Sequence, residues 1–302
     1  MKVLRVGVIG NGRQGHRHAR VLESIDGVKL VAIVDPKYSS VFASDISSSQ
    51  RVATVRSIEN LIDIGVDYCV VAVPPLAQTA IAQTLAEAGI PALLEKPLGV
   101  DLASSLATTE AFESRGLVAA INFIERFNPD LLKLRRDVES GALGKIEAIT
   151  TVRTSSSDKP PHIETILDLG IHDFDITMWI TGFSYTSVET SVTSIRDRPF
   201  DNGVLINGIV NNEIPVRHRV GYSSTPVERY IEIVASKYTV KISLVFDPTI
   251  HRPEPLELLH QAFRNKILGQ EVLIPQLKEA IKSMIVTEAA IKSREDGIAC
   301  SL

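Results

Sequence analysis

The first 121 residues carry short, continuous hydrophobic runs separated by stretches of helical pattern. Runs of this kind are typical of strands that a parallel sheet buries on both faces, with helices covering it. The pattern predicts strands at 3–9, 29–34, 67–73, 92–94 and 117–121, and helices at 13–24, 57–64, 78–88 and 101–114. We therefore expect a doubly wound parallel α/β sheet in this part of the chain.

The pattern changes at about residue 123. Beyond it, hydrophobic and polar residues alternate in successive runs, which is typical of antiparallel strands with one face against a core. Strands are predicted at 145–153, 188–195, 204–210, 216–222, 229–235 and 238–246, and helices at 129–140, 165–181, 255–268 and 275–294. We expect two domains: residues 1–122 form the parallel domain, and residues 123–302 form an α+β domain with an open, mostly antiparallel sheet. The open face of that sheet is a candidate interface for a homodimer or homotetramer.

Composition narrows the class of protein. The 302 residues are 44% hydrophobic and 23% charged, with a formal net charge of −4. This is typical of a globular protein and lacks the basic footprint of a nucleic-acid or membrane-surface binder. Apolar runs stay short of the roughly 20 residues that a membrane helix needs. Met1 leads almost directly into the first strand, without room for a signal peptide, and Cys69 and Cys300 have neither metal-site nor disulfide spacing. We expect a cytoplasmic protein.

A glycine-rich turn follows the first predicted strand. Gly10, Gly12 and Gly15 form G-x-G-x-x-G between a strand and a helix, as in the dinucleotide-binding Rossmann fold. There the first glycine makes the turn, the second lets the backbone approach a pyrophosphate, and the third lets the helix pack on the sheet. Asp35 follows Gly15 by 20 residues and ends the second strand, where a carboxylate can bind the ribose hydroxyls. We therefore expect NAD as the cofactor, and Lys37 keeps NADP open.

In such a sheet the ligand lies across the carboxyl ends of the strands. Further candidate cofactor contacts lie at or near these ends: Arg13, Gln14, Val73, Pro74, Gln78, Glu95 and Lys96. Lys96 is also a candidate catalytic residue, because Pro97 restricts its backbone to an extended form that aims it from the strand end. An ammonium there can hold a substrate hydroxyl and stabilise an alkoxide as hydride leaves. The alternative is an exposed loop lysine beside a surface glutamate.

The predicted helix 165–181 carries the second group of candidates. Asp168, His172 and Asp175 stand at i, i+4 and i+7, so on an α-helix they share one face. His172 titrates near neutrality and suits a base that removes a hydroxyl proton, while Asp168 can hold the imidazole or a neighbouring substrate hydroxyl. A structural polar network and a metal site are the other interpretations. No metal is expected, because the sequence supplies no further obvious ligands.

Some candidates have weaker support. Arg126 follows the last parallel strand and serves either the cleft or a salt link between the domains. Lys159 and His162 precede the Asp168 helix and are candidates for the pocket wall. His18, in the first helix, is expected to be a packing or surface residue. The sequence contains no G-x-S-x-G, P-loop or zinc-type histidine pair, so acyl transfer and nucleotide hydrolysis have no support.

Together these motifs resemble the Gfo/Idh/MocA oxidoreductases, the family of glucose–fructose oxidoreductase and inositol dehydrogenase. The resemblance rests on GNGRQGHRH, Asp35, Val73-Pro74-Pro75, Glu95-Lys96-Pro97 and DLGIHDFD, in order over residues 1–182. It implies Lys96, Asp168 and His172 as the catalytic and substrate-holding trio, with a nicotinamide cofactor. The family usually has a histidine where this chain has Gln78. The stretch 124–129, IERFNP, is similar to the branch that acts on UDP-N-acetylglucosamine-type sugars.

The resemblance implies hydride transfer between NAD(P) and a secondary hydroxyl of a sugar, nucleotide sugar or cyclic polyol. Two alternatives stay open. One is a non-catalytic sensor that binds the dinucleotide, against which the intact trio argues. The other is a reductase of an imine or tetrapyrrole, which a hydroxyl-gripping trio suits less well.

Overall fold

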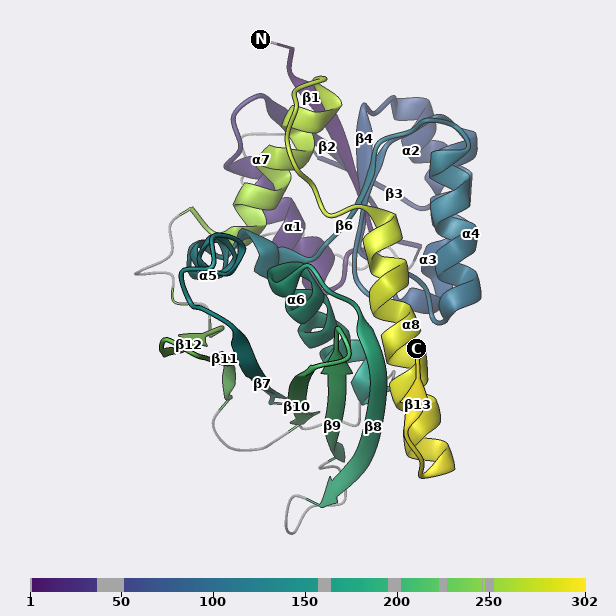
Figure 1. Ribbon diagram of the computed structural model, residues 1–302. Coiled ribbons are helices and arrows are strands. Elements are labelled where there is room, and N and C mark those ends of the chain that lie inside the picture. The colour runs from purple at the N-terminus through teal and green to yellow at the C-terminus, as the bar shows by residue number, and fades with distance from the viewer. Residues whose placement is uncertain are drawn as a thin grey trace. The chain divides into compact units, whose positions relative to one another are not determined.

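A computed structural model describes residues 2–36, 52–156, 164–194, 202–222, 227–245, 247 and 253–302 of the protein (Figure 1). Its contacts divide the chain into two compact units. Unit 1 comprises Met1–Ile124 and Pro253–Ala280, and unit 2 comprises Glu125–Arg252 and Ile281–Leu302. The domain boundary at residue 122 stays a prediction. The contacts add that the segment 253–280 packs with the N-terminal part of the chain.

Unit 1 is built on a parallel sheet with six described strands in the order β3-β2-β1-β4-β5-β6. The chain runs outward from β1 in one direction and from β4 in the other, so the strand order reverses between β1 and β4. This confirms the predicted doubly wound Rossmann sheet. The strands are β1 Leu4–Ile9, β2 Val28–Val34, β3 Ala53–Val55, β4 Tyr68–Val71, β5 Ala92–Leu94 and β6 Ala119–Ile121.

Helices pack on this sheet, and each buries part of its surface. Leu61 of α2 fits against Gly7 of β1, where a Cβ would approach its side chain to 2.7 Å. Asp101 caps α4 by accepting a hydrogen bond from the Ser104 N–H at 2.7 Å. The helices of unit 1 are α1 Arg13–Glu23, α2 Ile58–Ile64, α3 Pro75–Glu87, α4 Leu102–Glu113 and α7 Pro255–Ile267.

Unit 2 is built on a mixed sheet with seven described strands in the order β12-β11-β7-β10-β9-β8-β13. Only β7 and β10 pair in parallel, so the predicted, mostly antiparallel sheet is confirmed. Its inner face packs in one cluster with α6 and the later part of α8. The strands are β7 Ile146–Ser155, β8 Tyr185–Ser194, β9 Asn202–Val210, β10 Ile214–Tyr222, β11 Arg229–Ala235, β12 Thr239–Ser243 and β13 Cys300–Ser301. The helices are α5 Pro129–Glu139, α6 Ile171–Thr181 and α8 Leu277–Asp296, and α8 continues from unit 1 into unit 2.

Two buried arginines anchor α6. Arg153 of β7 donates from Nε to Asp173 Oδ1 at 3.0 Å and from Nη1 to Glu125 Oε1 at 2.9 Å. Arg126 forms a two-pronged contact with Asp175, at 3.0 and 2.5 Å. Such forked pairs are the strong form of a charge-assisted hydrogen bond. Burial raises the pKa of Asp173 to about 6, against the nearby Arg153 charge, and the Glu125 charge adds to the rise.

The Asp173 carboxyl should make stability depend on pH. The folded state holds its proton more tightly than the unfolded chain does, so its contribution to the free energy of unfolding falls as pH rises from 3.8 to about 6. Urea unfolding across this window should therefore show the gap between wild type and Asp173→Asn shrinking with rising pH, by on the order of 2–3 kcal/mol. The buried Ile180 of the same helix offers a control, Ile180→Val, for which the gap should stay constant because no titratable group is changed. A gap for Asp173→Asn that widens with pH contradicts the prediction.

Candidate functional site

Of the three glycines in the turn of unit 1, Gly12 has space for a side chain, and Gly10 and Gly15 do not. Gly10 has φ +99°, and a Cβ there would lie 2.5 Å from the Ala72 carbonyl oxygen. A Cβ at Gly15 would lie 1.8 Å from the Gly10 carbonyl oxygen, so the close packing of α1 on the turn requires glycine. A Cβ at Gly12 would meet no described atom within 4 Å. Gly12 is thus the position where added atoms would fill empty space.

The start of α1 suits an anion. Gly12 is its N-cap, no described side chain caps it, and its first turn carries no acidic residue. The first N–H groups of the helix and the positive end of its dipole therefore face the space beside Gly12. Arg13 is exposed and Gln14 half-buried at this end of the helix. These features fit the pyrophosphate of a dinucleotide.

Asp35 lies at the end of the neighbouring strand. Its N–H donates to the Val55 carbonyl at 2.9 Å and its side chain is buried, directly after β2. This is the strand end at which a ribose would lie. Val73 and Pro74 follow β4 at the strand next to β1 on the other side. Lys37, which kept NADP open, lies outside the described residues.

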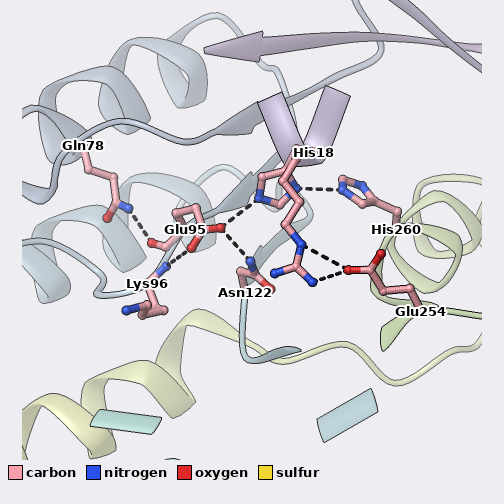
Figure 2. A network of polar contacts seen from close by, with 8 residues as sticks. His18, Gln78, Glu95, Lys96, Asn122, Glu254 and His260 are labelled. Atoms are coloured by element: carbon pink, nitrogen blue, oxygen red, sulfur yellow. Dashed lines mark hydrogen bonds and ion pairs between the residues drawn. The ribbon is translucent and has the colours of Figure 1, made fainter. Parts of the chain in front are cut away.

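Glu95 is the centre of a buried hydrogen-bond network at the end of β5 (Figure 2). Its Oε1 bonds His18 Nε2 at 2.9 Å and accepts from Asn122 Nδ2 at 2.7 Å, while Oε2 accepts from the Lys96 N–H at 3.1 Å. Burial by itself would raise the pKa of Glu95, but the hydrogen bond and charge of His18, the charge of Lys96 and the Asn122 bond outweigh it and lower the pKa. The carboxylate is therefore ionised near neutral pH, in the middle of the fold.

Gln78 holds the same loop from the other side. The side chain is fully buried, its Nε2 donates to the Glu95 carbonyl at 2.5 Å, and its Oε1 accepts from the Gly99 N–H at 2.9 Å. Both ends of the amide are thus engaged by the loop that carries Lys96. The cofactor contacts assigned to Gln78 and Glu95 stay predictions; the structure adds that both residues shape this loop.

The network includes two histidines. His18 Nδ1 and His260 Nε2 lie 2.8 Å apart, and both rings are buried. Packing was one of the two expectations for His18, but its polar role was missed. One signal was present: Gly15, His18, Ala19 and Leu22 occupy the i, i+3, i+4 and i+7 positions of one buried helix face. His260 carries no sequence signal for this contact, because it is 242 residues from His18.

The helix with the second group of candidates departs from the prediction. Residues Ile166–Gly170 form a π-helix, and the α-helix begins at Ile171. The α-helical spacing that put Asp168, His172 and Asp175 on one face therefore does not hold across this segment, and that part of the prediction is wrong. π-turns of this kind occur mostly at functional sites.

The three side chains also differ in their surroundings. Asp168 and His172 are half-buried, and the Tyr222 hydroxyl donates to Asp168 Oδ2. Asp175 is buried in its ion pair with Arg126. The substrate contacts assigned to Arg126 and Asp175 stay predictions, and the structure gives both charges a structural role. Tyr222 carried no signal before the structure placed it beside Asp168.

The candidate trio is divided between the units: Lys96, half-buried, belongs to unit 1, and Asp168 and His172 belong to unit 2. Lys159 and His162 lie outside the described residues. Among the residues that the structure covers, no group of three His, Cys, Asp or Glu side chains is placed to hold a metal ion. Within the same ranges, no helix is long and apolar enough to cross a membrane.

The chain is similar in sequence to known dehydrogenases and similar in fold to a solved dehydrogenase structure. Inositol 2-dehydrogenase 4 of Saccharopolyspora erythraea is 34% identical over 191 residues, which cover 61% of this chain and 56% of that protein. Myo-inositol dehydrogenase Hyg17 of Streptomyces leeuwenhoekii is 30% identical, covering 59% of this chain and 56% of that protein. The alignments thus span little more than half the length of these two relatives. Scyllo-inositol dehydrogenase from Lactobacillus casei, crystallised with NAD(H) and scyllo-inositol, has the same fold, with a TM-score of 0.87 at 18% identity over 99% of each chain.

Residues 4–123 match a family described as an oxidoreductase family with an NAD-binding Rossmann fold. The match covers the glycine turn, Asp35 and the Glu95–Lys96 loop, and it agrees with the predicted cofactor, NAD. The N-terminal segment 4–123 thus matches the Gfo/Idh/MocA oxidoreductases, in agreement with the predicted resemblance.

Proposed function

We propose that the protein is an NAD-dependent dehydrogenase of cyclic polyols, which oxidises a secondary hydroxyl to a ketone. The observation that carries the proposal is the pair of half-buried candidates, Asp168 and His172, at the π-turn, in a chain whose NAD domain presents Lys96 after β5. The inositol class is favoured because the relatives reported above are named inositol dehydrogenases.

Each residue of the trio has a distinct task in this proposal. Gly10, Gly12, Gly15 and Asp35 would hold NAD, which supplies the acceptor for the hydride that leaves the carbinol carbon. His172 accepts the hydroxyl proton as the C–H bond breaks. The Lys96 ammonium orients the hydroxyl and stabilises the developing negative charge on its oxygen.

Asp168 completes the set by accepting a hydrogen bond from a neighbouring hydroxyl. One of its oxygens already accepts from Tyr222, which fixes the carboxylate in one orientation. A carboxylate oriented in this way selects polyols with two adjacent hydroxyls, because the second hydroxyl has a defined acceptor.

A nucleotide sugar is less well supported as substrate. The resemblance to that branch lay in residues 124–129, and there Glu125 and Arg126 are engaged in the ion pairs with Arg153 and Asp175. These ion pairs explain the presence of Glu125 and Arg126 by their structural role, without a nucleotide ligand.

The proposal includes a homo-oligomer and a cytoplasmic location. Alternate residues on β10, such as Arg217 and Arg219, are exposed on the open face of the sheet, where a second copy can pack. Both cysteines are free, Cys69 within the core and Cys300 on β13, which agrees with a reducing compartment.

Replacement of His172 tests the reaction. His172→Ala should lower kcat by roughly 10²–10⁴ because it removes the base, and leave the Kd for NAD unchanged. The measurement is absorbance of reduced nicotinamide with myo-inositol, scyllo-inositol, glucose and UDP-N-acetylglucosamine. Turnover confined to UDP-N-acetylglucosamine would move the substrate class to nucleotide sugars. Tight NAD binding without turnover on any hydroxyl donor would favour the sensor, and activity on imines with NADH would favour the reductase.

The glycine turn offers a matched pair of variants. Gly12→Ala should fold with unchanged stability, since its Cβ enters space that no described atom fills, but should weaken NAD binding by about tenfold or more. Gly15→Ala should lower the free energy of unfolding by roughly 1–3 kcal/mol, because its Cβ collides with the Gly10 carbonyl. Calorimetric melting and NAD titration separate the two effects. Unchanged NAD affinity in Gly12→Ala would contradict the proposal that the cofactor's pyrophosphate lies beside Gly12.

A further inference from the structure

The Glu95 network gathers side chains from distant parts of unit 1 around one carboxylate. His18 comes from α1, Glu95 follows β5, Asn122 follows β6, and His260 comes from α7 (Figure 2). Their exposed fractions are 1%, 6%, 5% and 0%. Ionisable groups at this depth cost free energy unless they are paired. The proposed reaction uses neither His18 nor His260. A purely apolar contact between α1 and α7 would hold these elements without that cost.

The hydrogen bonds define where protons sit. Because the Glu95 carboxylate only accepts, His18 Nε2 is the donor of that bond. With both rings neutral, His18 Nδ1 accepts from His260 Nε2, and His260 Nδ1 carries no proton. With one more proton, His18 is an imidazolium that donates to His260 Nε2, and the His260 proton moves to Nδ1. Burial and the neighbouring His18 lower the pKa of His260 well below its usual range.

The chain of hydrogen bonds ends at His260. Its Nδ1 is buried and has no hydrogen-bond partner among the described residues. At its other end the chain of hydrogen bonds reaches the Lys96 N–H through the second oxygen of Glu95.

Further polar groups lie on the elements that carry the network. Arg17 of α1 makes an ion pair with Glu254, which precedes α7. Tyr68 of β4 is buried, which raises its pKa and keeps it neutral, and the charge of Arg264 on α7 opposes that rise.

We propose that His18 and His260 are positioning residues for Lys96: through Glu95 they fix the loop Glu95–Gly99, which carries it. The inference rests on the proposed function, in which Lys96 acts on the substrate. His260 holds the His18 ring, His18 holds the Glu95 carboxylate, and Glu95 accepts from the Lys96 N–H, so a change at His260 reaches Lys96 through three hydrogen bonds.

Variants of His260 test this through the NMR signal of Lys96, which needs no turnover. The probe is the ε-carbon signal of ¹³C-labelled lysine at one fixed pH, assigned by its loss in Lys96→Arg. In His260→Met the His18 Nδ1 loses its hydrogen-bond partner, so the His18 ring is no longer held at that end. The Lys96 signal should then shift or broaden, because the loop Glu95–Gly99 loses its fixed position. His260→Gln should restore the wild-type signal, because its amide can donate to His18 Nδ1.

Activity and packing controls complete the experiment. In His260→Met, kcat should fall by about tenfold to 100-fold, because the lysine shifts within its site, with the Kd for NAD unchanged. Leu259→Ala removes a fully buried side chain from the same helix and should lower stability without changing the Lys96 signal. If Leu259→Ala changes the signal as much as His260→Met, or if His260→Met leaves it unchanged, the inference is wrong.

A second variant covers the case in which His260→Met does not fold. His18→Met removes the donor to Glu95, so the Lys96 signal should change as in His260→Met, whereas His18→Gln keeps a donor and should retain the wild-type signal. An unchanged signal in folded His18→Met overturns the inference. If the signals change as expected but Lys96→Met turns over polyols at the wild-type rate, the network stands and the proposed role of Lys96 fails.

Discussion

The candidate chemistry of unit 1 depends on a single buried charge, the Glu95 carboxylate. A carboxylate at this depth is tolerated only when donors surround it, and here His18, Asn122 and the Lys96 N–H supply them. Because these donors come from separate strands and helices, satisfying the charge fixes their relative positions. Removing one donor would leave the rest with an unpaired charge, which costs more than the lost hydrogen bond itself.

Unit 2 uses the same device with the signs exchanged. Arg153 is a buried cation held by Asp173 and Glu125, and Arg126 holds Asp175. Residues two apart on an α-helix point about 200° apart, so the two aspartates hold α6 from nearly opposite sides and fix its rotation. That rotation determines where His172 lies. The π-turn before it adds a residue to the helical turn and so gives Asp168 an orientation that regular α-helical spacing would not.

The parallel sheet, the order of its βα units and the glycine turn could be predicted from sequence because they depend on local pattern. Continuous hydrophobic runs and G-x-G-x-x-G are read within about 30 residues. The contact between His18 and His260 could not, since nothing in either segment refers to the other across 242 residues. The π-turn at Ile166–Gly170 was missed for a related reason: local spacing favours an α-helix, and the choice between the two depends on packing. The strand β3, Ala53–Val55, was not predicted, because its A-T-V sequence lacks the continuous hydrophobic run that marked the equally short β5.

In both units the anchored residue is the neighbour of the candidate catalytic one. Glu95 precedes Lys96 and Asp173 follows His172, and in each pair the anchor is buried while the candidate is half-buried. Position is therefore transmitted through the backbone, as the bond from the Lys96 N–H to Glu95 illustrates. A residue placed through its backbone does not depend on its own head group alone for its position. Buried polar networks beside the site, rather than within it, reconcile fixed geometry with side chains that must exchange protons.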